Sequence, residues 1–341
     1  MADPISPADL LSHWINLADE RLGAMALSGS DEFFAPMHRM LKSSEPEWRA
    51  GVYDDHGKWM DGWETRRRRN IGHDHCIVQL AAPCTLAALE IDTRYFTGNY
   101  PPHASVEACR VTGPPGEDAP WVELLPHAAL KGNQRNVFGL HGTRIFTHLK
   151  LNIYPDGGVA RLRAYGTVHR DWAAPESTPI DLAAALNGGQ ALACSDEHYG
   201  SKQNLLLPGR GASMADGWET RRRREPGYDW VILRLGNVGR IQKVEIDTAH
   251  FKGNFPHRVS LHGRLLEGVG NVDLTSQCLY WPELLEPQAL QADHVRQFAA
   301  ELRDIGPISH VRLNIHPDGG LSRVRLLGVP EARFRNRGVG Y

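Results

Sequence analysis

Short runs in which hydrophobic and polar residues alternate recur along the chain and predict β-strands. Residues 231–235, 243–247 and 311–315 are rich in β-branched side chains and are bounded by Gly or Pro. A period of two is typical of a strand with one buried face. A further strand is expected at 160–166. The dominant pattern is therefore that of an all-β protein.

Helical patterns are few. Apolar residues recur at helical spacing over residues 7–22, where Ser6 precedes as a candidate N-cap. A second candidate helix covers 290–302, and a helix-like stretch covers 180–186. We expect these to be short additions to the strands.

The chain repeats itself. The nine residues DGWETRRRR occur unchanged at 61–69 and at 216–224, about 155 residues apart. Four more segments recur in the same order: SDE at 30–32 and 195–197, IDT at 91–93 and 246–248, GNYP or GNFP at 98–101 and 253–256, and LNI-x-PDGG at 151–158 and 313–320. A period of this length indicates a duplicated domain, because solenoid units are much shorter.

The repeat and the strand pattern together predict the architecture. We expect two jelly-roll β-sandwich domains, at 1–172 and 180–341, joined by a Pro-containing linker. The order of the shared motifs is similar to that of galactose-binding-like jelly rolls. The predicted fold class is thus all-β, a tandem duplication with a few short helices.

Composition narrows the function classes. The chain has 341 residues, of which 41% are hydrophobic, and 38 Lys and Arg balance 40 Asp and Glu for a net charge of -2. This balance argues against a nucleic-acid or membrane-surface partner. No apolar run approaches the ~20 residues of a membrane span, and no secretory signal is visible, so we expect a cytoplasmic protein.

The run of four arginines is the most distinctive candidate chemistry. Guanidinium groups bind carboxylates and planar carbonyl groups in a bidentate manner. If the run is extended, Arg66 and Arg68 face one way and Arg67 and Arg69 the other. A charge run is also typical of a solvated face or a nucleic-acid patch. Neither alternative explains why Trp, Glu and Thr recur with the arginines.

The acidic residues of the motif have two interpretations. Asp61 and Asp216 precede a Gly, where Asp often caps its own turn, and this interpretation stands beside a catalytic one. Glu64 and Glu219 are better acid–base candidates, because a turn does not require Glu before an arginine run.

Comparison of the copies also tests the histidines. The triplet at 73–75 is His-Asp-His, but its counterpart at 228–230 is Tyr-Asp-Trp, so zinc cannot be common to both copies. His250 and His316 stand where the first copy has Tyr95 and Tyr154. They are candidates for proton transfer, although a histidine beside a loop is often only a surface residue.

With these motifs the sequence resembles the allantoicase family. The resemblance rests on the doubled DGWETRRRR, on the two LNI-x-PDGG segments, on DTAHFKGNFP at 247–256 and on NLLLPGR at 204–210. It implies two jelly-roll domains, a homo-oligomer, and hydrolysis of allantoate to ureidoglycolate and urea. No cofactor is predicted. A divalent metal such as Mn²⁺ stays open, although the ligand spacing does not support one.

Such a reaction needs an acid to protonate the leaving urea, a base to activate water, and a guanidinium for the substrate carboxylate. The catalytic candidates are Glu64, Glu219, Asp61, Asp216 and His250. The substrate-binding candidates are Arg66, Arg68, Arg221, Arg223, Asp92, Asp247, Asn99, Asn254 and His316. The rival hypothesis is a tandem carbohydrate- or ureide-binding module without catalysis.

Overall fold

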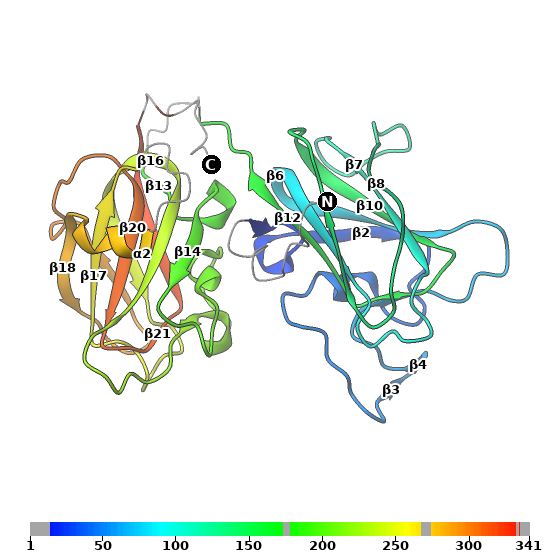
Figure 1. The fold of residues 1–341 in the computed structure, drawn as a ribbon, viewed down its shortest axis with the longest axis horizontal. Helices are drawn as coiled ribbons and strands as arrows, with labels where there is room; N and C mark the ends of the chain where they lie inside the picture. Colours follow the sequence, from blue (N-terminus) through cyan, green and yellow to red (C-terminus); the bar gives the residue numbers. More distant parts are fainter. Residues whose placement is uncertain (1–13, 173–177, 267–273, 332–333, 335–341) are drawn as a thin grey trace. The chain divides into compact units, whose positions relative to one another are not determined.

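The structure, a computed structural model, describes residues 14–172, 178–266, 274–331 and 334. The chain divides into two compact units, Met1–His169 (unit 1) and Arg170–Tyr341 (unit 2). Each unit is built on an eight-stranded antiparallel sheet folded into a sandwich (Figure 1). The prediction of an all-β tandem of sandwiches is therefore confirmed.

The two units use their strands in the same order. Unit 1 contains β1 (Ile15–Asn16), β2 (Met25–Gly29), β3 (Tyr53–Asp54), β4 (Gly57–Lys58), β5 (Trp63–Glu64), β6 (Asp74–Asp92), β7 (His103–Cys109), β8 (Val122–Ala129), β9 (Arg135–Gly139), β10 (Phe146–Tyr154), β11 (Gly158–Val159) and β12 (Arg161–Val168). Unit 2 contains β13 (Ile180–Asp181), β14 (Gln190–Cys194), β15 (Trp218–Glu219), β16 (Asp229–Asp247), β17 (Arg258–Arg264), β18 (Glu283–Ala289), β19 (Val295–Phe298), β20 (Ile308–His316), β21 (Gly320–Leu321) and β22 (Arg323–Pro330).

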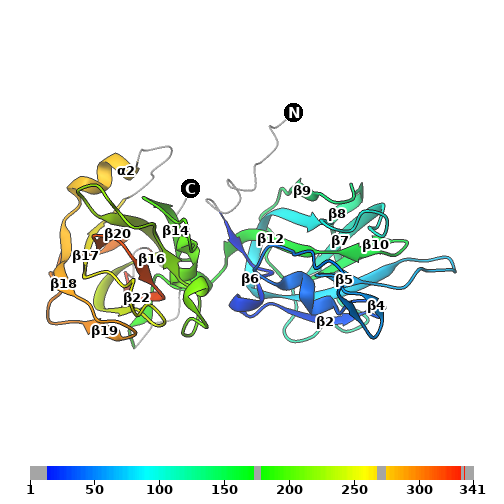
Figure 2. The ribbon, with the colours of Figure 1, turned by 90° about the horizontal axis from the view of Figure 1, so that it is seen from below.

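One long strand forms part of both layers of each sandwich. In unit 2 the first part of β16 pairs with β14 and β20, and its second part pairs with β19 and β22. The register shifts between Arg234 and Gly239, where the strand passes from one layer to the other. The predicted strands 231–235 and 243–247 are thus two parts of one strand. β6 plays the same role in unit 1, where β10, β7 and β8 lie side by side (Figure 2).

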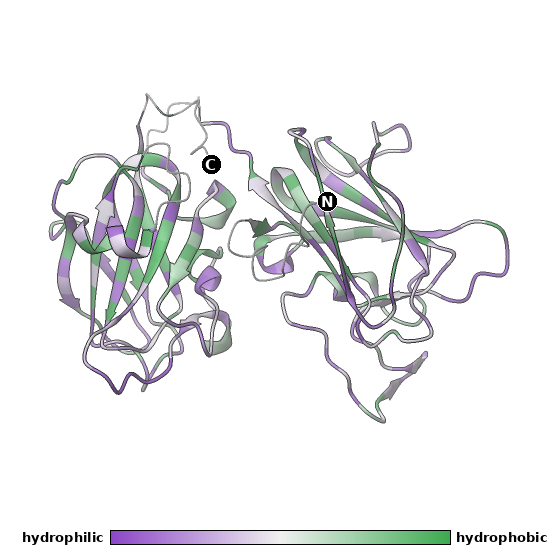
Figure 3. Ribbon diagram, in the orientation of Figure 1, coloured by the Kyte–Doolittle hydropathy of each residue, from purple (hydrophilic) through white to green (hydrophobic). Residues whose placement is uncertain are grey.

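The core lies between the layers. Hydrophobic residues alternate with hydrophilic ones along the strands of both units (Figure 3). In unit 1 the inward residues include Val78, Leu89, Leu151 and Leu162, all at most 1% exposed. Their burial stabilises the sandwich, at roughly 1.5–3 kcal/mol per large side chain. The layers hold the loops at their ends in place, and the recurring motifs lie at strand ends and in those loops.

The helix predictions were mostly wrong. The described part of 7–22 holds β1 and a 3-10 helix at Glu20–Leu22, and residues 7–13 lie outside the described residues. Residues 290–302 contain β19, which pairs with β16, so non-local pairing overrides the local helical pattern.

Helical structure takes other forms in the described residues. The stretch 180–186 begins with β13 and reaches only a 3-10 turn at Ala185–Asn187. The remaining 3-10 helices are Met37–Leu41, Lys202–Leu206, Met214–Asp216 and Cys278–Tyr280, and α2 covers Leu274–Gln277. Over the described ranges, no helix is long and apolar enough to cross a membrane.

Candidate active site

A buried tryptophan anchors each copy of the recurring motif. Trp63 is fully buried, and its indole Nε1 donates to the carbonyl of Asp31 at 2.8 Å. Trp218 repeats this contact with the carbonyl of Asp196 at 2.9 Å. Each short motif strand also pairs with the glycine-containing strand of the PDGG segment. The two indoles thus join the motif to the SDE segment, which explains why Trp recurs.

The glutamate after each tryptophan is held by an asparagine. Asn99 Nδ2 donates to Glu64 Oε1 at 2.6 Å, and Asn254 makes the same bond to Glu219. Both glutamates are half-buried, and no ion pair forms at either carboxylate in the described parts of the chain. Burial raises the pKa of the Glu64 carboxyl, against a smaller lowering by Asn99. The structure therefore brings together the Glu and Asn candidates of each copy.

The first arginine of each run pairs with the SDE aspartate. The Arg66 guanidinium lies 2.7 Å from Asp31 Oδ1, and its backbone N–H donates to Oδ2 of the same carboxylate. Arg221 contacts Asp196 in the same way. Despite these pairs, the side chains of Arg66 and Arg221 are 63% and 66% exposed. They therefore keep a solvent-facing edge that a ligand can reach.

The third arginine of each run is bound more deeply. Arg68 Nη1 contacts Asp74 Oδ1 at 2.6 Å, and its backbone N–H donates to Asp156 Oδ2 at 2.8 Å. Arg223 has the same contacts with Asp229 and Asp318. These guanidinium groups are mostly enclosed, so Arg68 and Arg223 tie the arginine run to the sheet and to the PDGG loop.

The remaining arginines face solvent. Arg67, Arg69, Arg222 and Arg224 are exposed, and Arg67 lies 3.9 Å from Asp156. Thr65 is buried and accepts the backbone N–H of Gly157 at 3.1 Å. Alternation within the motif thus places Trp and Thr inward, with Glu and the first arginine outward.

Asp61 lies in a buried ion-pair network. Its carboxylate contacts Arg161 at 2.6 Å and Lys42 at 2.8 Å. Although burial opposes ionisation, hydrogen bonds from both cations hold the pKa of Asp61 below its usual value. Asp216 pairs with Arg323 at 2.8 Å and also accepts the backbone N–H of Ala212. Both aspartates are therefore engaged in contacts that hold their loops.

The IDT aspartates are also paired, through different partners. Asp92 is fully buried and pairs with Arg94, which also contacts Glu45. Unit 2 has Ala249 in place of Arg94, and there Arg210 reaches Asp247 at 3.0 Å from another segment. A guanidinium thus covers the aspartate in both units.

His316 belongs to an exchanged aromatic pair. Its ring packs at a tilt against Tyr228 with centroids 4.7 Å apart, and Nε2 lies 3.0 Å from Ser260 Oγ. In unit 1 the rings change places: His73 packs at a tilt against Tyr154 at 4.7 Å, and the Tyr154 hydroxyl contacts Ser105. The exchange keeps one imidazole and one phenol at this place in both units. It favours a packing role for His316.

His250 contacts a backbone carbonyl of the segment that precedes the second copy of the motif. It is exposed, its Nε2 lies 2.7 Å from the carbonyl of Gly211, and its φ of 69° is held by Asp293. Tyr95 has the same φ, and its backbone N–H donates to Asn133 Oδ1 as that of His250 donates to Asp293. The backbone at this position is thus shared, while the side chain differs.

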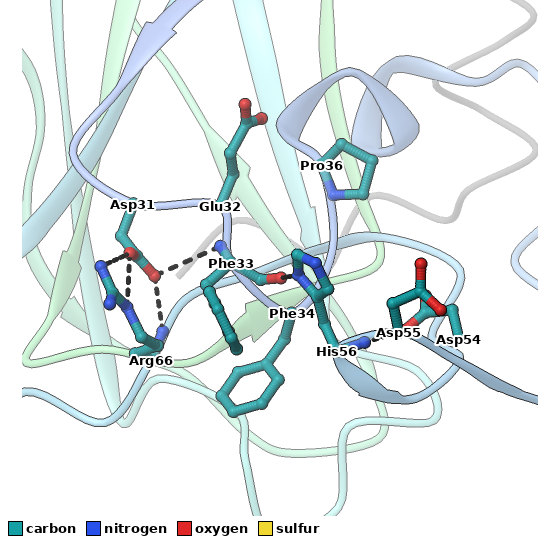
Figure 4. A pocket seen from close by; sticks show the side chains of 9 residues that line it. All are labelled: Asp31, Glu32, Phe33, Phe34, Pro36, Asp54, Asp55, His56 and Arg66. Atoms are coloured by element: carbon teal, nitrogen blue, oxygen red, sulfur yellow. Dashed lines mark hydrogen bonds and ion pairs between the residues drawn. The ribbon is translucent and has the colours of Figure 1, made fainter.

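A surface cavity of about 580 Å³ adjoins the motif in unit 1 (Figure 4). It is lined by Asp31, Glu32, Phe33, Phe34, Pro36, Asp54, Asp55, His56 and Arg66. Asp54 and Asp55 come from the β3–β4 hairpin, and unit 2 has a shorter segment in this place. The lining contains four carboxylates and one guanidinium. Asp31 pairs with that guanidinium, and the exposed edge of Arg66 is the part of the lining that can bind an anion.

Several residues around the motif were not singled out from the sequence. Asp31 and Asp196 lie in the recurring SDE segment, and Asp156 and Asp318 lie in the recurring LNI-x-PDGG segment. Their signal was the same as that of the arginines, because each recurs in both copies. In the described ranges, no group of three or more His, Cys, Asp or Glu side chains is arranged to hold a metal ion.

The fold and the site define a duplicated β-sandwich protein that presents one asparagine-held glutamate beside ion-paired arginines in each unit. Comparison with known proteins narrows this class. A family model described as "Allantoicase repeat" matches residues 15–169 and again 180–331. The chain belongs to the allantoicase family.

Relatives and solved structures agree with this assignment. The chain is 52% identical to a probable allantoicase of Pseudomonas aeruginosa, over 94% of this chain and 97% of the relative. It is also 52% identical to probable allantoicase 1 of Burkholderia mallei, over 96% and 98%. The crystal structure of allantoicase from Saccharomyces cerevisiae matches with a TM-score of 0.79 at 36% identity, over 95% of this chain and 98% of that one.

Proposed function

We propose that the chain hydrolyses allantoate to ureidoglycolate and urea, and that Glu64 and Glu219 are its acid–base groups. The reaction follows from membership of the allantoicase family. The rival, a tandem carbohydrate- or ureide-binding module without catalysis, is not favoured by relatives that match along almost the whole chain.

The observation that supports the glutamate roles is the Glu–Asn pair, which both units contain. Asp61, Asp216, Asp92 and Asp247 each pair with a cation. In the described structure Glu64 and Glu219 form no ion pair, and each accepts a hydrogen bond from an asparagine at Oε1. A half-buried carboxyl that no cation neutralises is suited to exchanging a proton with a bound ligand.

The chemistry then proceeds as a proton relay. A carboxylate removes a proton from water, the water oxygen attacks the central carbon of allantoate, and the bond from that carbon to one ureido nitrogen breaks. The protonated carboxyl returns the proton to that nitrogen, which leaves as urea. We propose that the exposed edges of Arg66 and Arg221 bind the substrate carboxylate, with Arg68 and Arg223 holding the run in place.

The other site candidates take supporting roles in this proposal. Asn99 and Asn254 orient the glutamates, and Asp61, Asp216, Asp92 and Asp247 stabilise the surrounding loops. Roles for His250 and His316 in the reaction stay predictions, as do the homo-oligomer and the cytoplasmic location. With no set of three metal ligands in the described ranges, the proposal uses no metal.

The test replaces each glutamate by glutamine, singly and together, and measures urea release from allantoate. Loss of a general acid–base group typically costs 10²–10⁴-fold, so we expect the double variant to lose at least about 100-fold in kcat. If the two units act independently, each single variant should keep about half of the wild-type rate of urea release. Glu123→Gln, an exposed glutamate on β8, is the matched control. Full turnover by a folded double variant would exclude these roles.

A further inference from the structure

Arg312, on β20 of unit 2, is a buried cation without a counter-ion. The residue is 5% exposed, and its Nε is buried without a hydrogen-bond partner. Across the described ranges its guanidinium forms no hydrogen bond and no ion pair, and it lies over the rings of Tyr228 and Trp230 at 5.5 and 5.4 Å. Burying an unpaired charge is costly, and cation–π contacts offset only part of that cost. Arg312 is therefore a candidate anion-binding group.

The equivalent place in unit 1 contains an anion. Lys150 on β10 stands directly opposite Glu107 on β7 in the strand register. Its Nζ lies 3.3 Å from Glu107 Oε2, and Asn152 Nδ2 donates to the same oxygen at 3.1 Å. One carboxylate thus satisfies both an ammonium and an amide on the neighbouring strand.

Unit 2 keeps the register and loses the carboxylate. Arg312 stands opposite His262 on β17, where unit 1 has Glu107, and Asn314 again lies beside them (strands in Figure 1). Asn314 Nδ2 lies 3.2 Å from His262 Nδ1. Since the amide nitrogen can only donate, Nδ1 accepts and the ring proton of neutral His262 is on Nε2. His262 thus takes over the hydrogen bond from the asparagine but not the negative charge of Glu107.

The surrounding charges do not replace the missing carboxylate. Burial, together with Arg312, lowers the pKa of His262, against an opposing effect of Glu283. Glu283 stands across from His262 on β18, and its carboxylate is bound by Arg303 at 2.9 Å. A second unsatisfied donor lies close by: the indole Nε1 of Trp281, which packs in the same cluster as Trp230.

We propose that unit 2 binds a small carboxylate at Arg312, which faces His262 where Lys150 of unit 1 faces Glu107. The guanidinium of Arg312 provides the charge, and Nε2–H of His262 is a further donor. This site is separate from the Glu–Asn pairs and does not depend on their catalytic role. The ligand chemistry is a compact monocarboxylate, which includes a carboxylate that carries a ureido group.

The test titrates the full-length protein with sodium acetate and with N-carbamoylglycine, a ureido carboxylate, using sodium chloride at equal ionic strength as the control. Binding is measured by calorimetry and by the shift in Tm. The variants are Arg312→Met, which removes the charge, and His262→Glu, which restores the carboxylate of unit 1. Glu64→Gln/Glu219→Gln reports binding at the motif instead. Urea release from allantoate is measured in parallel, so a failure of the proposed function is seen separately.

We expect both carboxylates to bind the wild-type protein and the Glu64→Gln/Glu219→Gln variant. Arg312→Met and His262→Glu should each weaken binding at least about tenfold, or 1.4 kcal/mol. His262→Glu should also raise Tm without ligand, because it pairs the buried guanidinium. Tighter binding of N-carbamoylglycine than of acetate would indicate a ureide as the ligand, and equal binding would indicate a plain carboxylate. Wild-type binding no stronger than that of chloride, or unchanged binding in both site variants, would overturn the proposal.

Discussion

Units 1 and 2 hold the same nine-residue motif with the same contacts, yet the cations and aromatic rings around it differ. The indole, the Glu–Asn pair and the two Arg–Asp pairs recur contact for contact. By contrast, Asp61 has two cations and Asp216 one, while Asp92 and Asp247 take their arginines from different segments. The difference teaches which contacts the motif requires and which only need some partner of the right charge.

The largest expected effect compares the two motif aspartates. Asp61→Asn leaves Arg161, which is fully buried, without its anion, so we expect a loss of about 3–5 kcal/mol in the free energy of unfolding. Asp216→Asn should cost less, because the Asp216 side chain is 17% exposed whereas that of Asp61 is 2% exposed. Urea denaturation followed by tryptophan fluorescence measures both.

The pH dependence of the stability lost in Asp61→Asn tests whether the ionised Asp61 carboxylate is its cause. The folded-state pKa of Asp61 is lowered, so its stabilisation is complete above the unfolded value of about 3.8 and disappears as the pH falls through the folded value. The difference between wild type and Asp61→Asn should therefore shrink in strong acid. An equal cost at pH 7 for the two aspartate variants would contradict the comparison.

A smaller effect is expected at the IDT aspartates. Arg94→Ala uncovers a fully buried carboxylate, so we expect a loss of about 2–3 kcal/mol. Arg210→Ala should cost less than about 1 kcal/mol, because the Arg210 side chain is 56% exposed. Glu45→Ala, which removes the exposed partner of Arg94, is the matched control and should be nearly neutral. Thermal unfolding measures both variants, and a lower Tm for Arg210→Ala than for Arg94→Ala would contradict the comparison.

The smallest effect concerns Glu64. Burial raises its folded-state pKa above the unfolded value of about 4.5, so the folded state binds the proton more tightly. Wild type should therefore lose stability relative to Glu64→Gln as the pH rises from about 4.5 through the folded pKa. Denaturation curves of both proteins from pH 4 to 8 measure this. A stability difference that stays flat over this range would show that burial does not perturb Glu64.

The sequence predicted the strands and the duplication well, because alternation and repetition are local signals. It failed at 290–302, where apolar spacing indicated a helix but pairing with β16 imposes an extended strand. It also divided β16 into two strands, since the passage between layers depends on how the whole sandwich closes.

For the site, the sequence provided the residue types but not their contacts. The motif pointed to Glu64 and Arg66, while Asp31, which binds Arg66, lies 35 positions away and requires the fold to bring it close. Both parities of the arginine run were open, and the structure shows that the favoured one is paired with internal carboxylates. The roles of the two histidines depended on neighbours that only the three-dimensional arrangement reveals.

The exchange of imidazole and phenol between the two positions of this ring pair shows how the sequences of duplicated copies can diverge. Moving from His73–Tyr154 to Tyr228–His316 takes two substitutions, and the intermediate carries two like rings. Either ring can bond the serine beneath it, so that intermediate keeps the hydrogen bond to Ser105 or Ser260. A single substitution that makes the two rings alike should therefore be tolerated, and the two copies can exchange identities at these positions one step at a time.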